Sequence, residues 1–303
     1  MRLLTRSDFD GIVCAALLKE LGVIEEMEYA HPKDLQDGKI AVSADDVLAN
    51  VPYVPGCGLW FDHHSSEKER LQLEGQYQGR SESAPSAARV IYNYYQDARL
   101  KKFDSMLEYV DRVDSAQLSE DEILNPTGWV LLGFLCDPRT GLGYHKSFTI
   151  SNLQLMKELM EAMRTQTIEE ILANPHVQER VNLYYENDAR CKAFLQEHTR
   201  VDGPVAITDA RGLTDLPPGN RFLIYSLFPD TNISIRLIDG RGKEFVAISV
   251  GYSVLNRTSN VNVGSLMLKY GGGGHKAVGT CQVPYADADR VLAELVEAIK
   301  ASA

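Results

Sequence analysis

Short apolar stretches that end in polar clusters recur along the first part of the chain. A polar turn at 6–11 separates the first of these stretches from an apolar helical run over 12–21. The predicted strands of this part cover residues 1–5, 39–43, 46–51 and 57–61. Strands that alternate with helices favour a parallel sheet, in which ligands bind beyond the carboxyl ends of the strands. We therefore expect the chemistry of this part in the polar clusters that follow its strands.

The pattern changes near residue 200, where Asp202-Gly203-Pro204 ends a long helix-rich region. The predicted helices before that point cover 86–96, 103–113, 151–163, 168–173 and 177–198. After it, predicted strands at 205–207, 222–225, 233–238 and 245–250 precede a closing helix at 288–299. We predict an α/β protein with a doubly wound, mainly parallel N-terminal domain over 1–185, a helical linker over 186–202 and a smaller α/β domain over 203–303. The length of 303 residues suits two domains.

Composition and charge narrow the function classes. No apolar run approaches the ~18 residues that span a bilayer, the N-terminus lacks the apolar core of a signal peptide, and five scattered cysteines suit a reducing compartment. We therefore expect a soluble, cytoplasmic protein without a membrane partner. The net charge of −11 argues against broad attachment to duplex nucleic acid. A small anionic substrate stays compatible with it, because metal ions, backbone N–H groups and a few arginines bind phosphate locally.

Two carboxylates, Asp8 and Asp10, lie two residues apart in the first polar turn. Alternate residues of an extended segment share a face, so both side chains can reach one cation, and Gly11 lets the chain turn sharply into the helix. The alternative is an acidic helix N-cap, which is common.

Asp62-His63-His64 follows the apolar stretch that ends at Phe61. A carboxylate with imidazoles suits Mn²⁺, Zn²⁺ or Fe²⁺ better than Ca²⁺, although two neighbouring histidines also occur as a surface pair. Asp111 and Asp114 are three residues apart on a predicted helix, so both can face one metal site. A solvated acidic helix end is the alternative there.

Four successive glycines, Gly271, Gly272, Gly273 and Gly274, precede His275. Such a run costs conformational entropy, and inside a folded domain it indicates backbone that approaches a ligand closely and cradles an anion with its N–H groups. A flexible linker is the alternative, but apolar segments flank the run on both sides.

The order and spacing of these motifs resemble the DHH phosphoesterase superfamily, in the branch that carries a DHH-associated C-terminal domain. The resemblance covers nearly the whole chain. Most of its specificity comes from the order of two motifs, Asp62-His63-His64 and, about 200 residues later, the GGGGH sequence. Members include RecJ-type exonucleases, nano-RNases, cyclic dinucleotide phosphodiesterases and exopolyphosphatase-like proteins. The resemblance implies a two-metal site, usually of Mn²⁺, in the N-terminal domain, and it is compatible with a homodimer.

The resemblance also assigns roles to residues of this chain. It implies that His64 polarises the attacking solvent or the phosphate, and that Arg257 binds phosphate together with the glycine run and His275. The implied metal ligands are Asp8, Asp10, Asp62, His63 and Asp111.

Two positions depart from the family pattern. Arg6 stands where the family has a histidine, and guanidinium does not ligate metals because it stays protonated. Asn50 stands at the best-placed counterpart of a family aspartate, with Asp45 or Asp46 as the alternatives. If Asn50 is that counterpart, the centre holds one ion, or two only when substrate phosphate is present. Arg6 either neutralises substrate phosphate or pairs with Asp62.

The leading hypothesis is an Mn²⁺-dependent phosphoesterase of short oligonucleotides or small nucleotides, in which Asp62, His64 and Arg6 are catalytic and metal-activated water attacks phosphorus. Mg²⁺ or another divalent ion is the alternative cofactor. Inorganic polyphosphate is the alternative substrate. Tyr252 and Tyr270 distinguish the two substrates: stacking of either ring on a base would favour a nucleotide over polyphosphate. Tyrosine in such strand-rich segments, however, is more often a core residue. A degenerate, non-catalytic nucleotide- or phosphate-binding protein is the third reading, which the substitutions at positions 6 and 50 support.

Overall fold

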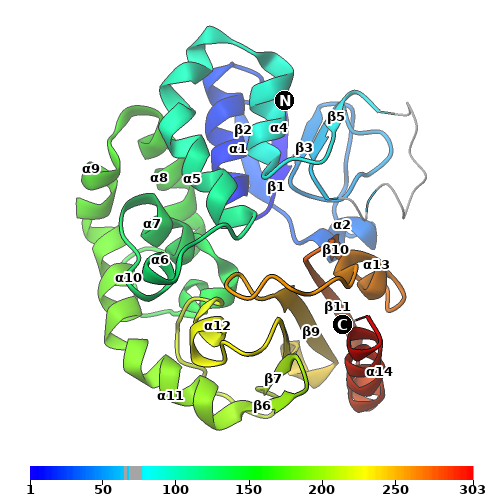
Figure 1. Ribbon diagram of the computed structural model, residues 1–303. Helices are drawn as coiled ribbons and strands as arrows, with labels where there is room; N and C mark the ends of the chain where they lie inside the picture. Colours follow the sequence, from blue (N-terminus) through cyan, green and yellow to red (C-terminus); the bar gives the residue numbers. More distant parts are fainter. Residues whose placement is uncertain (65–66, 68–76, 303) are drawn as a thin grey trace. The chain divides into compact units, whose positions relative to one another are not determined.

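A computed structural model describes residues 1–64, 67 and 77–302 of the chain. These residues form two compact units (Figure 1). The first comprises described residues of the ranges 1–64, 73–118 and 125–186, and the second those of 65–72, 119–124 and 187–303. Each unit contains one β-sheet.

The sheet of the first unit has five parallel strands in the order β2-β1-β3-β4-β5. The strands are β1 (Arg2–Thr5), β2 (Glu26–Tyr29), β3 (Asp46–Ala49), β4 (Leu59–Asp62) and β5 (Gly79–Ser81). Leu4, Leu48 and Trp60 are paired neighbours in this register, and they form an apolar cluster with Leu35 of the short helix α2 (Pro32–Gln36). Because side chains alternate along a strand, the intervening residues face the opposite side of the sheet.

Helices α1 (Phe9–Glu20) and α4 (Ala87–Tyr95) pack on each other, α1 also against β1 and α4 against β4 and β5 (Figure 1). Residues 9–18 of α1 are all buried, because α5 and α8 also pack against this helix. The remaining helices of the unit are α5 (Asp104–Asp114), α7 (Gly128–Cys136), α8 (Asn152–Thr165), α9 (Ile168–Ala173) and α10 (Pro175–Glu186), with 3₁₀ turns at Ala98–Phe103, Pro138–Thr140 and Leu142–Tyr144. Helix α1 is therefore the central helix of the unit, and its N-terminus is fixed from several sides.

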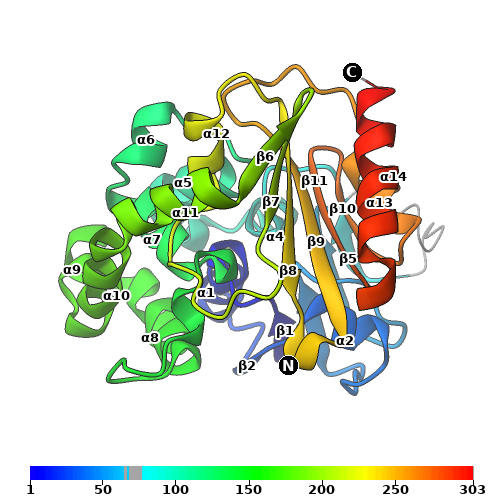
Figure 2. The same ribbon diagram turned by 90° about the horizontal axis from the view of Figure 1, so that it is seen from below.

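The second unit is built on a mixed six-stranded sheet in the order β10-β11-β9-β8-β7-β6 (Figure 2). The strands are β6 (Thr199–Asp202), β7 (Val205–Asp209), β8 (Ile233–Asp239), β9 (Phe245–Tyr252), β10 (Gly273–His275) and β11 (Val278–Pro284). The helices are α6 (Glu120–Leu124), α11 (Asp188–His198), α12 (Leu223–Leu227), α13 (Val263–Leu268) and α14 (Ala288–Lys300), with 3₁₀ turns at Arg241–Lys243 and Tyr285–Asp287. Alternate residues of β8 and β9 are buried, and they form one core with the apolar faces of α13 and α14.

The α/β fold is confirmed, and most of the predicted elements agree with the structure to within a few residues. Three are wrong. Residues 39–43 form no strand: Ile40 and Val42 pack on the apolar cluster beside α2 without pairing to the sheet. Residues 222–225 enter α12, because a short apolar run does not distinguish a strand from a buried helix. The helix predicted over 177–198 is two helices, α10 and α11, with a break at Asn187.

In the part of the chain that the structure describes, no helix combines the length and the apolar character that a membrane crossing needs.

Our first prediction concerns Asp46 at the start of β3. Its carboxylate accepts hydrogen bonds from Arg2 Nε and from the Ser43 backbone at 2.8 and 2.7 Å. Burial opposes the charged form, but these donors outweigh it and hold the pKa of Asp46 below its ordinary 3.8. A depressed carboxyl pKa stabilises the fold above the ordinary value, and the contribution is lost as the pH falls through the folded-state pKa. We expect Asp46→Asn to lower the free energy of unfolding by about 2 kcal/mol near neutral pH.

Urea denaturation followed by circular dichroism measures this difference. The gap between wild type and variant should narrow below pH 3.8, where the wild-type carboxyl becomes protonated. Equal stabilities near neutral pH would contradict the prediction.

Candidate active site

Polar side chains of the first unit gather where the parallel strands β1, β3 and β4 end. Asp8 and Asp10 follow β1, Asn50 follows β3, and Asp62 is the last residue of β4. Asn50, Asp62 and Asp10 are at most 1% exposed, so these polar groups are buried in the fold. The carboxyl edge of this sheet therefore carries the first and second predicted motifs together.

Asp8 is the N-cap of α1, and both of its oxygens have partners. Its Oδ1 accepts from the Gly11 backbone N–H at 2.9 Å and from the Asn50 amide at 3.0 Å. Its Oδ2 lies 3.1 Å from Nε of Arg6, with which it forms an ion pair. Arg6 is thus paired with Asp8, whereas the sequence had suggested Asp62 as one of its partners. Asp8 is therefore the acidic helix N-cap that was the alternative to a metal ligand in this motif.

Asp10 lies within the first turn of α1, but its partners belong to another helix. Its two oxygens accept from the backbone N–H groups of Ala87 and Ala88 at 2.9 and 2.8 Å, at the N-terminus of α4. These N–H groups have no partner inside the helix, and the helix dipole favours an anion there. Burial, and after it the nearby charge of Asp114, raises the pKa of Asp10 to about 7.

His63 joins Asp10 and Asp114 into a compact group. Its Nε2 lies 3.3 Å from Asp114 Oδ2 and 3.7 Å from Asp10 Oδ2, and its Nδ1 is 3.2 Å from the carbonyl oxygen of Ala84. One donor atom from each of the three residues lies within 4.8 Å of the other two. Burial opposes protonation of His63, but the surrounding carboxylates, led by Asp114, outweigh it and raise its pKa. Two carboxylates and an imidazole at this spacing can hold a divalent metal ion.

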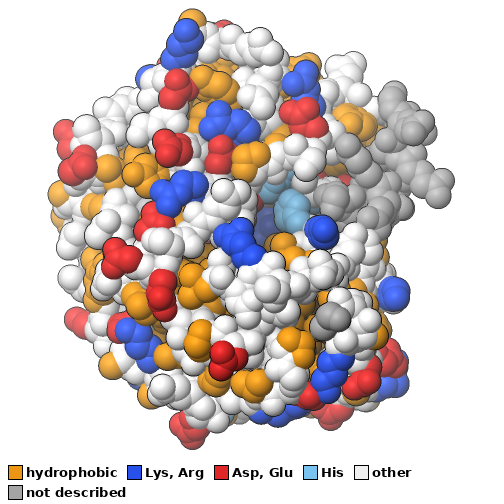
Figure 3. Space-filling model, viewed as in Figure 1, with side chains coloured by type: hydrophobic (Ala, Val, Ile, Leu, Met, Phe, Trp, Pro, Cys, Tyr) orange, Lys and Arg blue, Asp and Glu red, His pale blue; other side chains and the backbone are white. Residues whose placement is uncertain are grey.

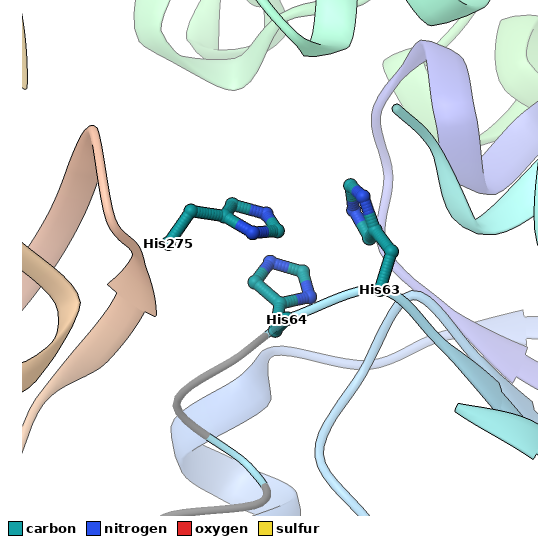
Figure 4. A group of neighbouring side chains, drawn as sticks. All are labelled: His63, His64 and His275. Carbon is teal, nitrogen blue, oxygen red and sulfur yellow. The ribbon is translucent and has the colours of Figure 1, made fainter. Parts of the chain in front are cut away.

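His64 is held by the carboxylate of Asp62. Its Nδ1 lies 2.8 Å from Asp62 Oδ1, and its backbone N–H donates to Asp62 Oδ2 at 3.2 Å. The imidazole rings of His63 and His64 meet edge to face with their centroids 4.7 Å apart (Figure 4). Burial raises the pKa of Asp62 to about 7, and burial, with the charges of His63 and Arg6, lowers the pKa of His64 well below its ordinary value.

Asp111 and Asp114 have different surroundings although they share α5. Asp111 pairs with Arg89 at 2.7 Å and accepts from the Ser86 hydroxyl at 2.7 Å. The structure thus brings Asp114, and not Asp111, to His63 and Asp10. The motif resemblance implied Asp111 as the ligand, but in the structure Arg89 and Ser86 occupy the oxygens of its carboxylate.

The predicted phosphate-binding residues belong to the second unit. Gly273 to His275 form β10, which pairs with β11, and a side chain at Gly274 would place Cβ 2.2 Å from the carbonyl oxygen of Val278. The close approach of β10 and β11 is therefore enough to require a glycine at position 274, and no bound ligand is needed to explain it. The Nε of Arg257 donates to the Val254 carbonyl at 2.9 Å.

The two tyrosines considered for base stacking also have partners in the second unit. Tyr252 donates its hydroxyl to the Val261 carbonyl, and Tyr270 donates to Glu294 at 2.8 Å. Both rings pack against the core of the unit, which agrees with the alternative that they are core residues.

Comparison with solved structures finds the same fold in other proteins. A pGpG-specific phosphodiesterase, PggH from Vibrio cholerae, is 43% identical over 100% of this chain and 99% of its own, with a TM-score of 0.76. The DHH domain of a member of a ribosomal protein family (11% identity, TM-score 0.54) covers 99% of this chain and 85% of its own. An exopolyphosphatase-related protein from Bacteroides fragilis (13% identity, TM-score 0.50) covers 98% and 91%. No protein-family model and no curated protein sequence matches the chain.

This chain has an α/β fold and is 43% identical, over its full length, to a phosphodiesterase. Together these findings place it in the class of phosphoester hydrolases. The chain belongs to the DHH superfamily of phosphoesterases.

Our second prediction concerns Gly11, which closes the turn between β1 and α1. A Cβ at this position would lie 2.1 Å from the carbonyl oxygen of Arg6, so the backbone itself would have to move. We expect Gly11→Ala to lower the free energy of unfolding by about 2–3 kcal/mol, as measured by urea denaturation. Gly143→Ala is the control: its Cβ would meet only the end of the Asn152 side chain, at 3.1 Å, which can rotate away. Equal losses in both variants would show that the close approach at Gly11 is unimportant.

Proposed function

We propose that the chain is a divalent-metal-dependent phosphodiesterase that hydrolyses short linear dinucleotides, with pGpG as the first substrate to test. The observation that carries this proposal is the 43% identity, over the full length of both chains, to a pGpG-specific phosphodiesterase. The geometry at the carboxyl edge of the first sheet supports the same chemistry.

We infer a metal site at Asp10, His63 and Asp114. The donor set combines hard carboxylate oxygens with a borderline imidazole nitrogen, which suits Mn²⁺ and also accommodates Mg²⁺ or Zn²⁺. Burial pushes the pKa of Asp10 towards neutrality, so a cation that keeps its carboxylate ionised offsets a real electrostatic cost. A divalent ion bound there supplies positive charge to the phosphoryl oxygens and makes water more acidic.

His64 is our candidate for moving a proton during hydrolysis. With Nδ1–H donating to Asp62, the ring has the tautomer in which Nε2 is unprotonated. The lowered pKa of His64 keeps this ring neutral near pH 7, so Nε2 is a proton acceptor. Asp62 holds the orientation of the ring through the hydrogen bond at Nδ1 and also accepts from the His64 backbone N–H, and we assign it to positioning.

Arg257, the glycines at 271–274 and His275 stay our candidates for binding the substrate phosphate, on the strength of the motif resemblance. We also retain domain boundaries of 1–185, 186–202 and 203–303 as our inference. Acidic and basic side chains are interspersed over the face seen in Figure 3, in keeping with the net charge of −11. That surface suits a short substrate better than a long duplex, which needs clustered Lys and Arg.

Our third prediction concerns turnover. We expect the purified chain to convert pGpG to GMP when Mn²⁺ is present, and chelation to lower the rate by more than about 100-fold, because a bound ion contributes several kcal/mol. Asp62→Ala should lower kcat by about 100-fold because His64 loses its fixed tautomer. The assay is chromatography of the released mononucleotide.

The same assay tests the competing functions. It includes longer oligonucleotides, adenosine 3′,5′-bisphosphate, cyclic dinucleotides and inorganic polyphosphate. Release of phosphate from polyphosphate alone would favour an exopolyphosphatase. Tight binding of a nucleotide without turnover of any substrate would favour a non-catalytic binding protein.

Our fourth prediction separates the two aspartates of α5. We expect Asp114→Asn to weaken Mn²⁺ binding by about 100-fold or more, because it removes one of three ligands. Asp111→Asn is the matched control on the same helix: it should leave Mn²⁺ affinity nearly unchanged and cost about 1 kcal/mol of stability, because Arg89 loses its partner. Isothermal titration measures the first effect and urea denaturation the second. A larger loss of affinity in Asp111→Asn than in Asp114→Asn would reverse the assignment.

A further inference from the structure

Asp8 and Asp10 differ in the groups that already occupy their oxygens. Each carboxylate oxygen offers about two acceptor positions. Oδ1 of Asp8 accepts from both Gly11 and Asn50, and Oδ2 faces the Arg6 guanidinium at 3.1 Å. An ion on Oδ1 of Asp8 would have to displace one of these two N–H donors, and an ion on Oδ2 would lie beside the permanently charged guanidinium of Arg6.

Asp10 has room for a cation by the same count. Each of its oxygens accepts one backbone N–H of α4, at 2.8 or 2.9 Å. Oδ1 also accepts from the Cys14 thiol at 3.7 Å, whereas Oδ2 keeps a second acceptor position. Its Oδ2 is the oxygen that lies 3.7 Å from His63 Nε2. Asp114 contributes a further oxygen 3.3 Å from the same nitrogen. The metal-binding capacity of this sheet edge therefore lies at Asp10 and not at Asp8.

Asn50 stabilises the arrangement in which Asp10, and not Asp8, is open to a metal ion. Its backbone adopts a left-handed conformation with φ of 57°, which asparagine tolerates better than most residues, and its side-chain amide donates to Asp8. A carboxylate at position 50 would instead bring a second negative charge against Asp8 and would require a cation between the two. The neutral amide and the guanidinium of Arg6 together satisfy Asp8 without a metal ion.

Arg6 is placed to act on substrate. Its side chain is 30% exposed while its Nε is anchored by a carboxylate that is 9% exposed. The anchor fixes the planar guanidinium, whose other N–H groups can meet a phosphoryl oxygen with bidentate geometry.

We propose that the centre holds one divalent ion, at Asp10, His63 and Asp114, and that Arg6, held by Asp8, supplies the second positive charge to the substrate phosphate. This inference deepens the proposed function and rests on it. It assigns Arg6 a direct part in phosphate binding, and it makes Asp8 a positioning residue for Arg6 in place of the metal ligand that the motif resemblance implied.

The first test counts ions. The wild-type chain is stripped with chelator and equilibrated with Mn²⁺, and bound manganese is measured by elemental analysis, isothermal titration and electron paramagnetic resonance. We expect one Mn²⁺ per chain, with the spectrum of an isolated ion. The double variant Arg6→His with Asn50→Asp offers an imidazole and a carboxylate instead, and it should bind two ions with an exchange-coupled spectrum.

Two ions in the wild type overturn the inference, and this result does not depend on whether the double variant folds. If the wild type hydrolyses pGpG with two ions bound, the proposed function stands and the inference fails. If the wild type binds one ion but hydrolyses no phosphoester of the panel, the proposed function fails, and the role of Arg6 in phosphate binding fails with it.

The second test addresses Arg6 itself. Arg6→Met should lower kcat/KM for pGpG by about 100-fold, as expected for loss of one charged donor to the transition state, with one Mn²⁺ still bound at unchanged affinity. Arg6→Lys keeps the charge but not the planar fork and should lie between wild type and Arg6→Met. The inhibition constant of inorganic phosphate should rise in parallel. Wild-type kcat/KM in Arg6→Met, or loss of the ion from it, would contradict the role assigned to Arg6.

Discussion

The candidate site depends on the two hydrogen bonds that Asp10 accepts from the N-terminus of α4. They join residues that are 77 and 78 positions apart, and they fix the start of α1 against the helix that follows β5. An N-terminal turn has N–H groups without helical partners, and a carboxylate is the side chain that satisfies two of them at once. Because Asp10 cannot move without freeing those donors, one of its oxygens stays directed at His63. The rest of the polar cluster is arranged around this fixed anion.

Around Asp10 the fold buries more negative than positive charge. Burial raises the pKa values of both Asp10 and Asp62 to about 7, so their ionised forms are costly without a cation. Arg6 offsets part of this charge through Asp8, and His63, with its raised pKa, offsets another part. A divalent ion bound at Asp10, as we propose, would relieve the repulsion among these buried carboxylates.

The sequence was sufficient for the fold class, for most of the elements and for the family, since apolar stretches that end in polar clusters have a direct physical meaning in parallel sheets. It placed Asn50 at the end of β3, whereas Asp46 lies at the start of that strand and pairs with Arg2. The motif resemblance implied Asp111 as a ligand, whereas the carboxylate that lies beside His63 is that of Asp114; Asp111 pairs with Arg89, 22 residues earlier on another helix. The sequence also did not show which groups donate to each carboxylate of the first motif, since these are the Asn50 side chain after β3 and backbone N–H groups of α4.

The same charge distribution bears on the size of the substrate. The chain carries a net charge of −11, and at the candidate site Arg6 and the divalent ion that we propose are the positive groups beside the sheet edge. Screening limits the reach of surface charge to roughly 8–10 Å at physiological salt, so a short dinucleotide, the substrate that we propose, would interact mainly with these local positive groups. A long polyanion extends beyond that distance and meets the acidic remainder of the surface, where each added phosphate is repelled. With the proposed ion bound, an acidic protein of this kind would discriminate against long nucleic acids by electrostatics, before any contact with a base contributes.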